Sequence, residues 1–346
     1  MSVSPTEVSL GSVRKLALFG GSWLLAALLP KVRKLPWAIE VFTSPRHLED
    51  AVNGEGQTLA EVLRQAEVPF QAVDEISPCP ALEAFVDGQT LGIAIGAAWV
   101  FPHALASKFS GKFFDFMGID LPRYRGGAHY TWAILNQHRR GACNLQVIEG
   151  GSETFHRGKI LCSESYVFPL DCRTPQDFFE FAVPRETAFL EAFFDRVQRQ
   201  ETFRLSALDE SQRSFYPFLN TKLNGWVDWS WSVAEIERFI CAFDNPYPGA
   251  STLWRGQRVF LKNTVFHERD GTFHPFTAGL VLRAAAGEVH VAARGGTLVI
   301  REIRDESQAP VVVQEGDRLF TPARELESAL VKNVSYGGKG LEVAPC

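Results

Sequence analysis

Segments typical of β-strands and of α-helices alternate along the first half of this 346-residue chain. Short apolar runs predict buried strands, and apolar residues three or four apart predict helices. This alternation, with short connections, favours an α/β fold: a doubly wound, mostly parallel sheet with helices on both faces. The expected strands are 15–19, 38–43, 69–73, 91–95, 112–116, 142–148 and 159–162, and the expected helices are 23–29, 59–67, 103–109, 130–136 and 175–199.

The pattern changes after about residue 204. An amphipathic helix is expected over 233–243, with Ser232 as its N-cap, and the NPYPG run at 245–249 ends it. Short strands separated by turn residues then predict a small barrel. We therefore expect two domains, residues 1–204 and 205–346. The expected barrel strands are 251–253, 258–265, 279–283, 288–292 and 297–302.

An apolar segment near the start, residues 16–30, follows Arg14 and Lys15 and superficially resembles a signal-peptide core. Two adjacent glycines interrupt it, basic KVRK follows directly, and no small-residue cleavage site is present. It is also too short to span a membrane. We predict a strand, a glycine turn and a helix here, and hence a cytoplasmic protein with no membrane partner.

Cysteine spacing gives no sign of a metal centre. None of the cysteines has zinc-like spacing, and reduced thiols are expected, although Cys162 and Cys172 lie close enough in sequence to meet. Glu149, Glu153 and His156 have helix-face spacing, but two glycines between them disfavour a helix. No metal is expected. The six cysteines stand at positions 79, 143, 162, 172, 241 and 346.

The most distinctive motifs lie within residues 91–136. GAAWVFP at 96–102 follows one expected strand, and LPRYRGG at 121–127 follows the next. Together they resemble the formyl-tetrahydrofolate-dependent formyltransferase family, which includes methionyl-tRNA formyltransferase and the amino-sugar N-formyltransferases. WVDW at 226–229 and NPYPGA at 245–250 are similar to the family's C-terminal domain. The resemblance implies a Rossmann-like formyltransferase domain followed by a small OB-like barrel.

The resemblance also implies a cofactor, formyl-tetrahydrofolate or another folate. The loop at 96–101 corresponds to the family loop whose backbone lines the pterin pocket. Its residues are Gly96, Ala97, Ala98, Trp99, Val100 and Phe101.

The LPRYRGG run supplies candidate substrate-binding residues, Arg123, Tyr124, Arg125 and Gly126. Guanidinium groups at a pocket rim suit a phosphate or a carboxylate. Arg125 has an equal alternative, which is to hold the glycine turn through backbone carbonyls. For Arg123 a plain surface position is the simpler interpretation.

The catalytic positions implied by the resemblance are altered. The family has an Asn-x-His pair before the LPxYRG run, where this chain has Asp115 and Met117. Its third residue, an Asp, has Glu153 as nearest counterpart. An ionised carboxylate only accepts hydrogen bonds and repels a tetrahedral oxyanion, and a thioether cannot exchange protons. We therefore predict that the usual Asn–His–Asp route does not operate.

Three alternatives follow for the altered site. In the first, burial keeps Asp115 protonated so that it donates a hydrogen bond. In the second, His129, His156 or Glu153 replaces the missing base. In the third, the catalytic role is lost. Solvent-exposed positions are the simpler interpretation for both histidines. The chain is thus either an enzyme with a rearranged site or a catalytically silent relative that binds a ligand or a partner protein.

Charge bears on the substrate. The chain has 35 Lys+Arg and 40 Asp+Glu, and residues 204–346 contain 16 and 17 of them. RNA affinity depends on basic phosphate contacts, which the acidic loop at 45–57, with Glu49, Asp50 and Glu55 against Arg46, does not offer. A small amine or a nucleotide-sugar is therefore favoured over tRNA. A homodimer stays open.

Overall fold

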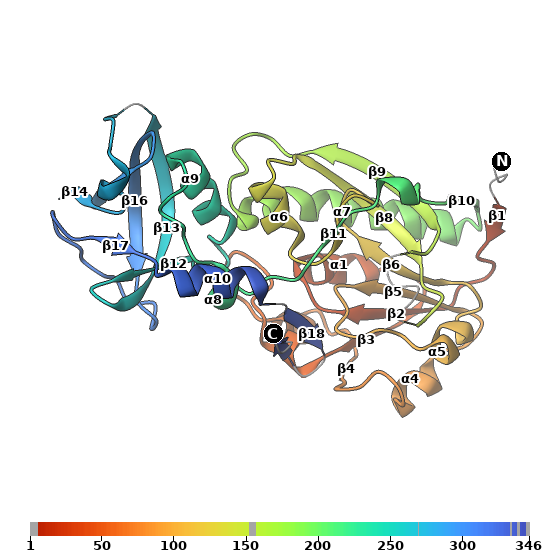
Figure 1. The fold of residues 1–346 in the computed structure, drawn as a ribbon. Coiled ribbons are helices and arrows are strands. Elements are labelled where there is room, and N and C mark those ends of the chain that lie inside the picture. Colours follow the sequence, from red (N-terminus) through yellow and green to blue (C-terminus); the bar gives the residue numbers. More distant parts are fainter. Residues whose placement is uncertain (1–5, 152–156, 269, 333, 338–339, 344–346) are drawn as a thin grey trace.

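The computed structural model describes residues 6–151, 157–268, 270–332, 334–337 and 340–343. It has two large sheets, one built from the first half of the chain and one from the second (Figure 1). The predicted α/β class and its doubly wound first half are confirmed.

The first sheet has seven strands in the order β4-β3-β2-β5-β6-β8-β9. The five strands from β4 to β6 are parallel, and β8 and β9 run antiparallel at one edge. The strand bounds are β2 Lys15–Gly20, β3 Ala38–Thr43, β4 Phe70–Ala72, β5 Thr90–Ile95, β6 Phe113–Met117, β8 Arg140–Val147 and β9 Ile160–Val167.

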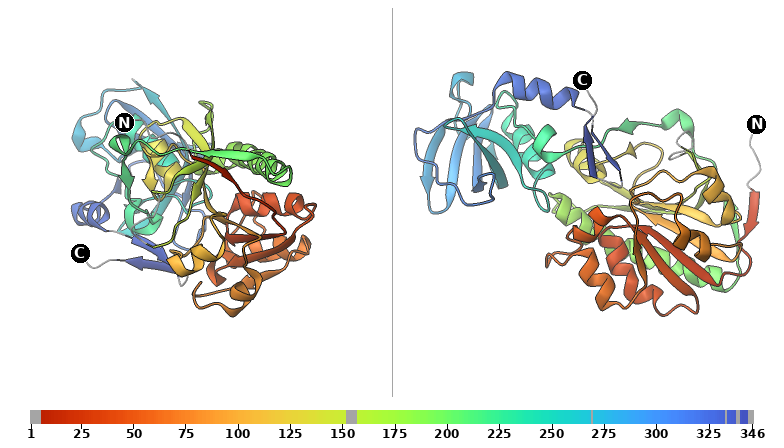
Figure 2. Two further views of the ribbon diagram at one scale, coloured as in Figure 1. Left: turned by 90° about the vertical axis from the view of Figure 1, so that its right-hand side faces the viewer. Right: turned by 90° about the horizontal axis from the view of Figure 1, so that it is seen from below.

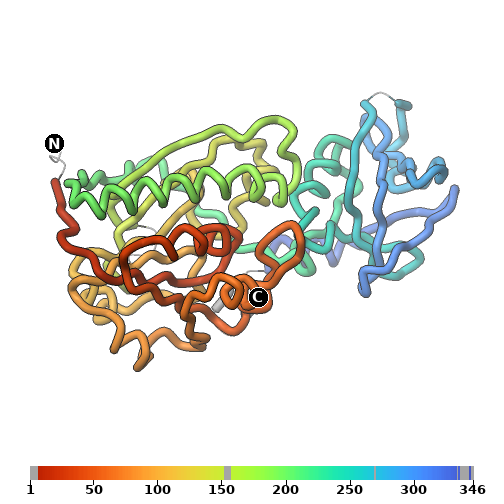
Figure 3. Tube along the Cα trace, turned by 180° about the vertical axis from the view of Figure 1, so that it is seen from behind, coloured from red at the N-terminus to blue at the C-terminus, as the bar shows by residue number. Residues whose placement is uncertain are grey.

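Helices cover both faces of this sheet. Apolar residues of α1, α3 and α7 share one core with the strands, and those of α4 and α5 form a second core on the opposite face. Figure 3 shows α7 running beside α1 on the first of these faces. The helix bounds are α1 Trp23–Val32, α2 Pro45–Glu49, α3 Leu59–Gln65, α4 Pro80–Phe85, α5 His103–Lys108, α6 His129–Leu135 and α7 Pro175–Gln198.

The chain reverses its direction of winding between β2 and β5. Connections from β2 lead outward through β3 to β4, and the chain then returns to β5 on the other side of β2. Gly20 marks the close approach of the two loops there, because an added Cβ would overlap the carbonyl oxygen of Ile95 and lie 2.8 Å from the Ala97 nitrogen. Such a reversal opens a crevice at the carboxyl ends of the strands.

The second sheet is antiparallel, with six strands in the order β14-β15-β16-β13-β12-β17. Its two edges approach each other through a bridge between Leu280 and Arg318, so the sheet curls into a half-barrel. The barrel-like prediction for this half is confirmed. The strand bounds are β12 Ala250–Trp254, β13 Gln257–Glu268, β14 Val281–Ala285, β15 Glu288–Ala293, β16 Gly296–Arg304 and β17 Leu319–Phe320.

Helix α9 (Val233–Ala242) joins the two halves. Ser232 and Glu235 form the capping box that begins it, as the sequence predicts for Ser232. Its inner face packs with residues of α6 and α7 as well as with the second sheet, so one apolar core spans both halves. The division at residue 204 stays a prediction.

Several short elements hold the junction and the chain ends. Strand β11 pairs with β7, and the hairpin of β18 and β19 returns to the junction, where Val334 bridges to Phe218 (Figure 2). The remaining bounds are β1 Thr6–Ser9, β7 Arg125–Gly126, β10 Thr202–Leu205, β11 Phe215–Tyr216, α8 Thr221–Asn224, α10 Ala323–Val331, β18 Val334–Gly337 and β19 Gly340–Val343, with 3-10 turns at Glu210–Gln212 and Pro275–Thr277.

Two local predictions have clear outcomes. The apolar segment after Lys15 forms β2, a glycine turn and α1, as expected. The segment 45–57, expected as a loop, begins with α2, because Ser44 caps its N-terminus and Pro45 occupies its first turn. No helix in the described part of the chain is long and apolar enough to cross a membrane. The five cysteines it contains are free thiols.

Candidate functional site

A cavity of about 700 Å³ opens at the carboxyl ends of β2, β5 and β6. Its walls come from the loops after these strands, from α6 and α7, and from segments 218–222 and 243–248 of the second half. It therefore occupies the crevice at the winding reversal and extends to the junction of the halves. This volume is within the usual range for a small-molecule or cofactor pocket.

The loop expected to line a pterin pocket forms one wall. Gly96, Ala97, Trp99, Val100 and Phe101 line the cavity, whereas Ala98 is buried and is absent from the lining. Backbone hydrogen bonding fixes this loop, since the Gly151 nitrogen donates to the Phe101 oxygen over 2.8 Å. Gly96 has a positive φ of 64°, a conformation that glycine adopts without strain.

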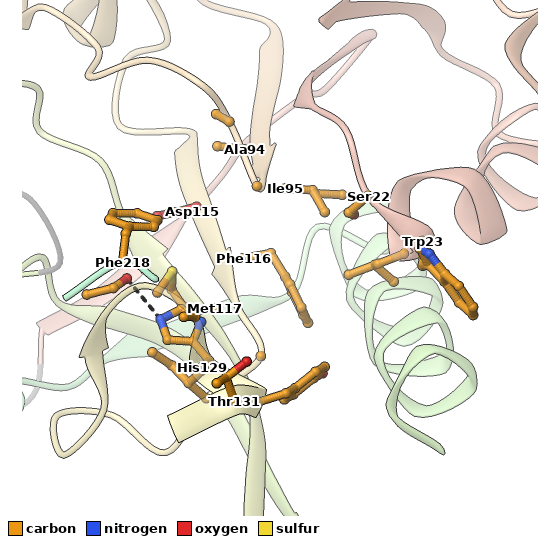
Figure 4. A pocket seen from close by; sticks show the side chains of 18 of the residues that line it. Ser22, Trp23, Ala94, Ile95, Asp115, Phe116, Met117, His129, Thr131 and Phe218 are labelled. Atoms are coloured by element: carbon orange, nitrogen blue, oxygen red, sulfur yellow. Dashed lines mark hydrogen bonds between the residues drawn. The ribbon is translucent and has the colours of Figure 1, made fainter. Parts of the chain in front are cut away.

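Asp115 and Met117 both line the cavity from β6 (Figure 4). The intervening Phe116 points to the opposite face of the sheet, where it packs against α7 through Phe189. Residues two apart on a strand share a face, so Asp115 and Met117 project together. Burial raises the pKa of the Asp115 carboxyl to about 7, because a low-dielectric site disfavours its charged form.

His129 lies at the first position of α6 and also lines the cavity. Its Nε2 is 2.9 Å from the Gly126 carbonyl oxygen, the contact drawn in Figure 4. Burial lowers the pKa of the imidazole to about 4. The ring is therefore neutral near pH 7, with Nε2 donating to the carbonyl and Nδ1 left as the unprotonated nitrogen.

Two further predicted site residues, Glu153 and His156, lie outside the described residues. Gly150 and Gly151, which precede them, line the cavity.

The LPRYRGG run takes a different position from the one expected. Gly126 alone of its four candidate residues lines the cavity. Arg125 is buried and pairs through both terminal nitrogens with Glu210, at 2.7 and 2.5 Å. Among the described residues, Arg125 thus pairs with Glu210 and does not line the cavity, and both roles expected of it stay predictions.

Its neighbours likewise contact other parts of the chain. Tyr124 stacks between His138 and Tyr216, with ring centroids 4.5 and 4.8 Å away. Arg123 is exposed and hydrogen-bonds to Gln212, as expected for a surface residue. A substrate role for either residue stays a prediction without support from the cavity.

The sequence interpretation did not identify Glu186 of α7, which lines the cavity and is 4% exposed. Its carboxyl lies against Gly118, where an added Cβ would overlap it, and accepts from the Tyr130 hydroxyl over 3.5 Å. Burial raises the pKa of Glu186 to about 7. The spacing of Glu186 could have indicated its burial, because it lies four residues from both Ala182 and Leu190 on the buried face of α7.

Asn144 is a second residue that sequence interpretation missed. Its side-chain amide donates to the carbonyl oxygens of Met117 and Ile119, over 3.1 and 2.8 Å, and its oxygen accepts from Ser163. Asn144 therefore fixes the backbone turn that follows β6.

Comparison with known proteins finds similarity to formyltransferases. Residues 220–316 match the model "Formyl transferase, C-terminal domain". Methionyl-tRNA formyltransferase of Desulfotalea psychrophila is 28% identical over 200 residues, which are 57% of this chain and 58% of that protein. The Acidobacterium capsulatum enzyme is 29% identical over 207 residues, 59% of this chain and 63% of that protein. Residues 220–316 thus match a formyltransferase domain, and more than half of the chain is similar to methionyl-tRNA formyltransferases.

The matches to these tRNA enzymes thus span about 60% of their length. Solved structures show the same fold over more of the chain. A sugar 3N-formyltransferase, WlaRD, crystallised with dTDP and 5-N-formyl-THF, has a TM-score of 0.61 at 14% identity, covering 84% of this chain and 97% of that one. The N-formyltransferase of Helicobacter canadensis, with folinic acid and dTDP-3-aminofucose, gives 0.59 at 14%, covering 83% and 98%.

HypX from Aquifex aeolicus in complex with tetrahydrofolic acid has a TM-score of 0.57 at 19% identity, covering 93% of this chain and 48% of that one. At these identities the likeness establishes the fold, which includes both halves of the chain.

Proposed function

We propose that the cavity binds a formyl-carrying reduced folate and that this formyltransferase-family protein transfers formyl to a small primary amine, slowly, through a protonated Asp115. The observation that carries the proposal is the place of Asp115, which lines the cavity from β6 at the position where the family resemblance implies an Asn, and burial raises its pKa to about 7. A neutral carboxyl donates one hydrogen bond and therefore replaces the amide donor.

The cavity suits a folate. Its volume is adequate for a flat bicyclic ring with a side arm, and residues of the loop at 96–101 other than Ala98 form one wall. Structural neighbours were crystallised with 5-N-formyl-THF, folinic acid or tetrahydrofolic acid, as their descriptions state. When bound, such a folate supplies the formyl group.

Asp115 then sets the pH dependence of the reaction. In its protonated form it hydrogen-bonds an oxygen that becomes negatively charged, whereas its ionised form repels that charge. Met117, at the neighbouring catalytic position, has no proton to exchange. The expected outcome is a rate below that of ordinary enzymes, in which the contribution of Asp115 falls above pH 7.

A silent binding protein is the second candidate, favoured by the thioether at Met117. In this case the cavity holds the same folate, but no formyl group is released. If the chain is an enzyme, its acceptor is a small amine and not tRNA. RNA binding depends on basic phosphate contacts, and the second half of the chain is near neutral in charge.

Folate binding is tested by titrating the full chain with 5-formyl-tetrahydrofolate and following tryptophan fluorescence and heat. Ala97→Trp fills the cavity beside the loop, and Ala104→Trp places the same side chain on the exposed surface of α5. We expect wild type and Ala104→Trp to bind and Ala97→Trp to lose binding. Absent binding in wild type, or equal binding in all three, would overturn the proposal.

Catalysis is tested by incubating the chain with 10-formyl-tetrahydrofolate and a panel of primary amines and dTDP-linked amino sugars. Release of tetrahydrofolate that requires both the amine and Asp115 supports the enzyme. Folate binding without any release establishes the silent protein instead.

A further inference from the structure

Glu186 is a buried carboxyl that lines the cavity beside Gly118, the residue that follows Met117. Asp115 projects from one face of β6, and Glu186 approaches the end of the same strand from α7, on the opposite face. The cavity passes around the end of β6 at Gly118, which it also includes in its lining. The two carboxyls thus serve two regions of one cavity.

The space beside Glu186 is maintained by glycine at position 118. The backbone φ of Gly118 is outside the positive range, so the glycine is needed for space, since a Cβ there would overlap the carboxyl oxygen. Of the polar groups facing Glu186, the Tyr130 and Tyr166 hydroxyls and the Cys143 thiol come from α6, β9 and β8. None of them is a cation.

From Tyr130, whose hydroxyl contacts Glu186, the cavity wall continues through aromatic rings. Trp23 and Phe179 stack with ring centroids 5.4 Å apart, and Tyr130 meets Phe179 edge-on at 4.9 Å. All three line the cavity, as do Phe116 and Val183. Aromatic faces attract cations, and a carboxylate among them completes the recognition elements of an ammonium group with an apolar substituent.

We propose that Glu186 binds the ammonium group of the acceptor amine and takes its proton, and that the acceptor is a primary amine with an apolar or aromatic substituent. This inference rests on the proposed formyl transfer. The step is R–NH3⁺ + Glu–COO⁻ → R–NH2 + Glu–COOH: one N–H bond breaks, one O–H bond forms, and the proton later passes to water. The neutral amine that results is the nucleophile.

The chemistry favours Glu186 over His129 for this task. A base is most effective when its pKa lies near the working pH. The pKa of Glu186 is about 7, whereas that of His129 is about 4, so the imidazole is the weaker proton acceptor. His129 also uses Nε2 to hold the Gly126 carbonyl. Glu186 therefore performs the role for which Met117 lacks a titratable group.

The test compares 2-phenylethylamine with its neutral analogue, 2-phenylethanol, by calorimetric titration of the full chain. At about pH 8 we expect wild type to prefer the amine by about tenfold or more, consistent with a charge-assisted contact. Glu186→Gln should abolish this preference, and Glu180→Gln, an exposed change on the same helix, should retain it. At about pH 5 the wild-type preference should fall, because the carboxyl is then protonated.

Equal preference in wild type and Glu186→Gln would overturn the inference, as would no preference in wild type. Gly118→Ala is the second variant, used if Glu186→Gln is unstable: it keeps the carboxyl but displaces it, and should also reduce the preference. Tighter binding of a dTDP-linked amino sugar, unaffected by Glu186→Gln, would refute the apolar class.

Folate titration on the same samples separates the two proposals. Folate binding without amine preference refutes the role of Glu186 alone. Amine preference without folate binding refutes the proposed function and leaves the amine site in place.

Discussion

Two carboxyls line this cavity, the partly buried Asp115 and the buried Glu186. Both have a pKa raised to about 7 by burial, so each changes charge near neutral pH. Strongly shifted groups that line one cavity are typical of functional sites, because charge burial opposes stability and needs a compensating use. At the two positions where the family resemblance implies an amide and an imidazole, this chain has Asp115 and Met117.

The shifted pKa of Glu186 predicts a stability effect. Its carboxyl titrates at about 4.5 when unfolded and about 7 when folded, so the folded state holds the proton more tightly. Stability from this group is present below pH 4.5 and is lost as pH rises through 7. One pKa unit corresponds to about 1.4 kcal/mol, so the free energy of unfolding falls by about 3 kcal/mol as the pH rises through this range.

Glu186→Gln should therefore match wild type in thermal stability at about pH 5 and exceed it at about pH 8. Scanning calorimetry across this range measures the difference, with Glu180→Gln as the exposed control. A constant difference between Glu186→Gln and wild type at all pH values would contradict a raised pKa.

Restoring the family's pair gives another prediction. Asp115→Asn with Met117→His should increase formyl transfer over wild type at about pH 8 by about 10² or more, because it supplies a permanent donor and an acid–base group. Tetrahydrofolate release measures the rate, and each single variant is a control. Absence of any gain would mean that the cavity has diverged beyond these two side chains.

Strand β11 lies in the segment between β10 and α9, and its pairing with β7 attaches this segment to the first half of the chain. Arg125 is buried, and Glu210 is half-exposed, so Glu210→Gln leaves a buried charge with a weaker partner. Because water still reaches the site, we expect a loss of about 2 kcal/mol, below the 3–5 kcal/mol typical of fully buried pairs. Thermal unfolding measures it.

Arg213→Ala is the matched control, since this exposed side chain approaches the same carboxyl at 3.9 Å. It should change stability by less than about 0.5 kcal/mol. Equal effects of the two substitutions would show that the buried geometry of Arg125 contributes nothing.

Local sequence patterns predicted the main elements because their signals are local. Strands such as β5 and the helix α9 follow from apolar periodicity and a capping residue. Helix α4 escaped prediction since it buries only Leu82 and has no side-chain cap. Strands β7 and β11 have two residues each and pair across about ninety positions, which no local pattern reveals.

At the site, the sequence predicted which strand ends contribute residues, but it did not predict which residues each side chain contacts. Asp115, Met117 and the loop at 96–101, apart from Ala98, line one cavity. The ion pair of Arg125 depends on Glu210, which lies outside every motif. The role of Glu186 depends on the space left by Gly118, a tertiary contact invisible in either segment alone.

For the whole molecule, the core shared by α6, α7, α9 and the second sheet couples the two halves. The Thr131 hydroxyl donates to the buried Ala242 carbonyl over 3.1 Å, and Phe178 and Ile240 belong to the same apolar cluster. We therefore expect both halves to unfold in one transition. Calorimetry with tryptophan fluorescence checks this, and two well-separated transitions would contradict it.

The proposed role of Asp115 is tested most directly by the ratio of formyl-transfer rates, Asp115→Asn over wild type, between about pH 5 and pH 9. The ratio cancels the titration of the amine and of Glu186, which both proteins share. Because wild type loses its protonated Asp115 above pH 7, the ratio should be constant below about pH 6 and rise about tenfold per pH unit above 7. A ratio independent of pH, or no turnover by wild type at any pH, would contradict the proposed role of Asp115.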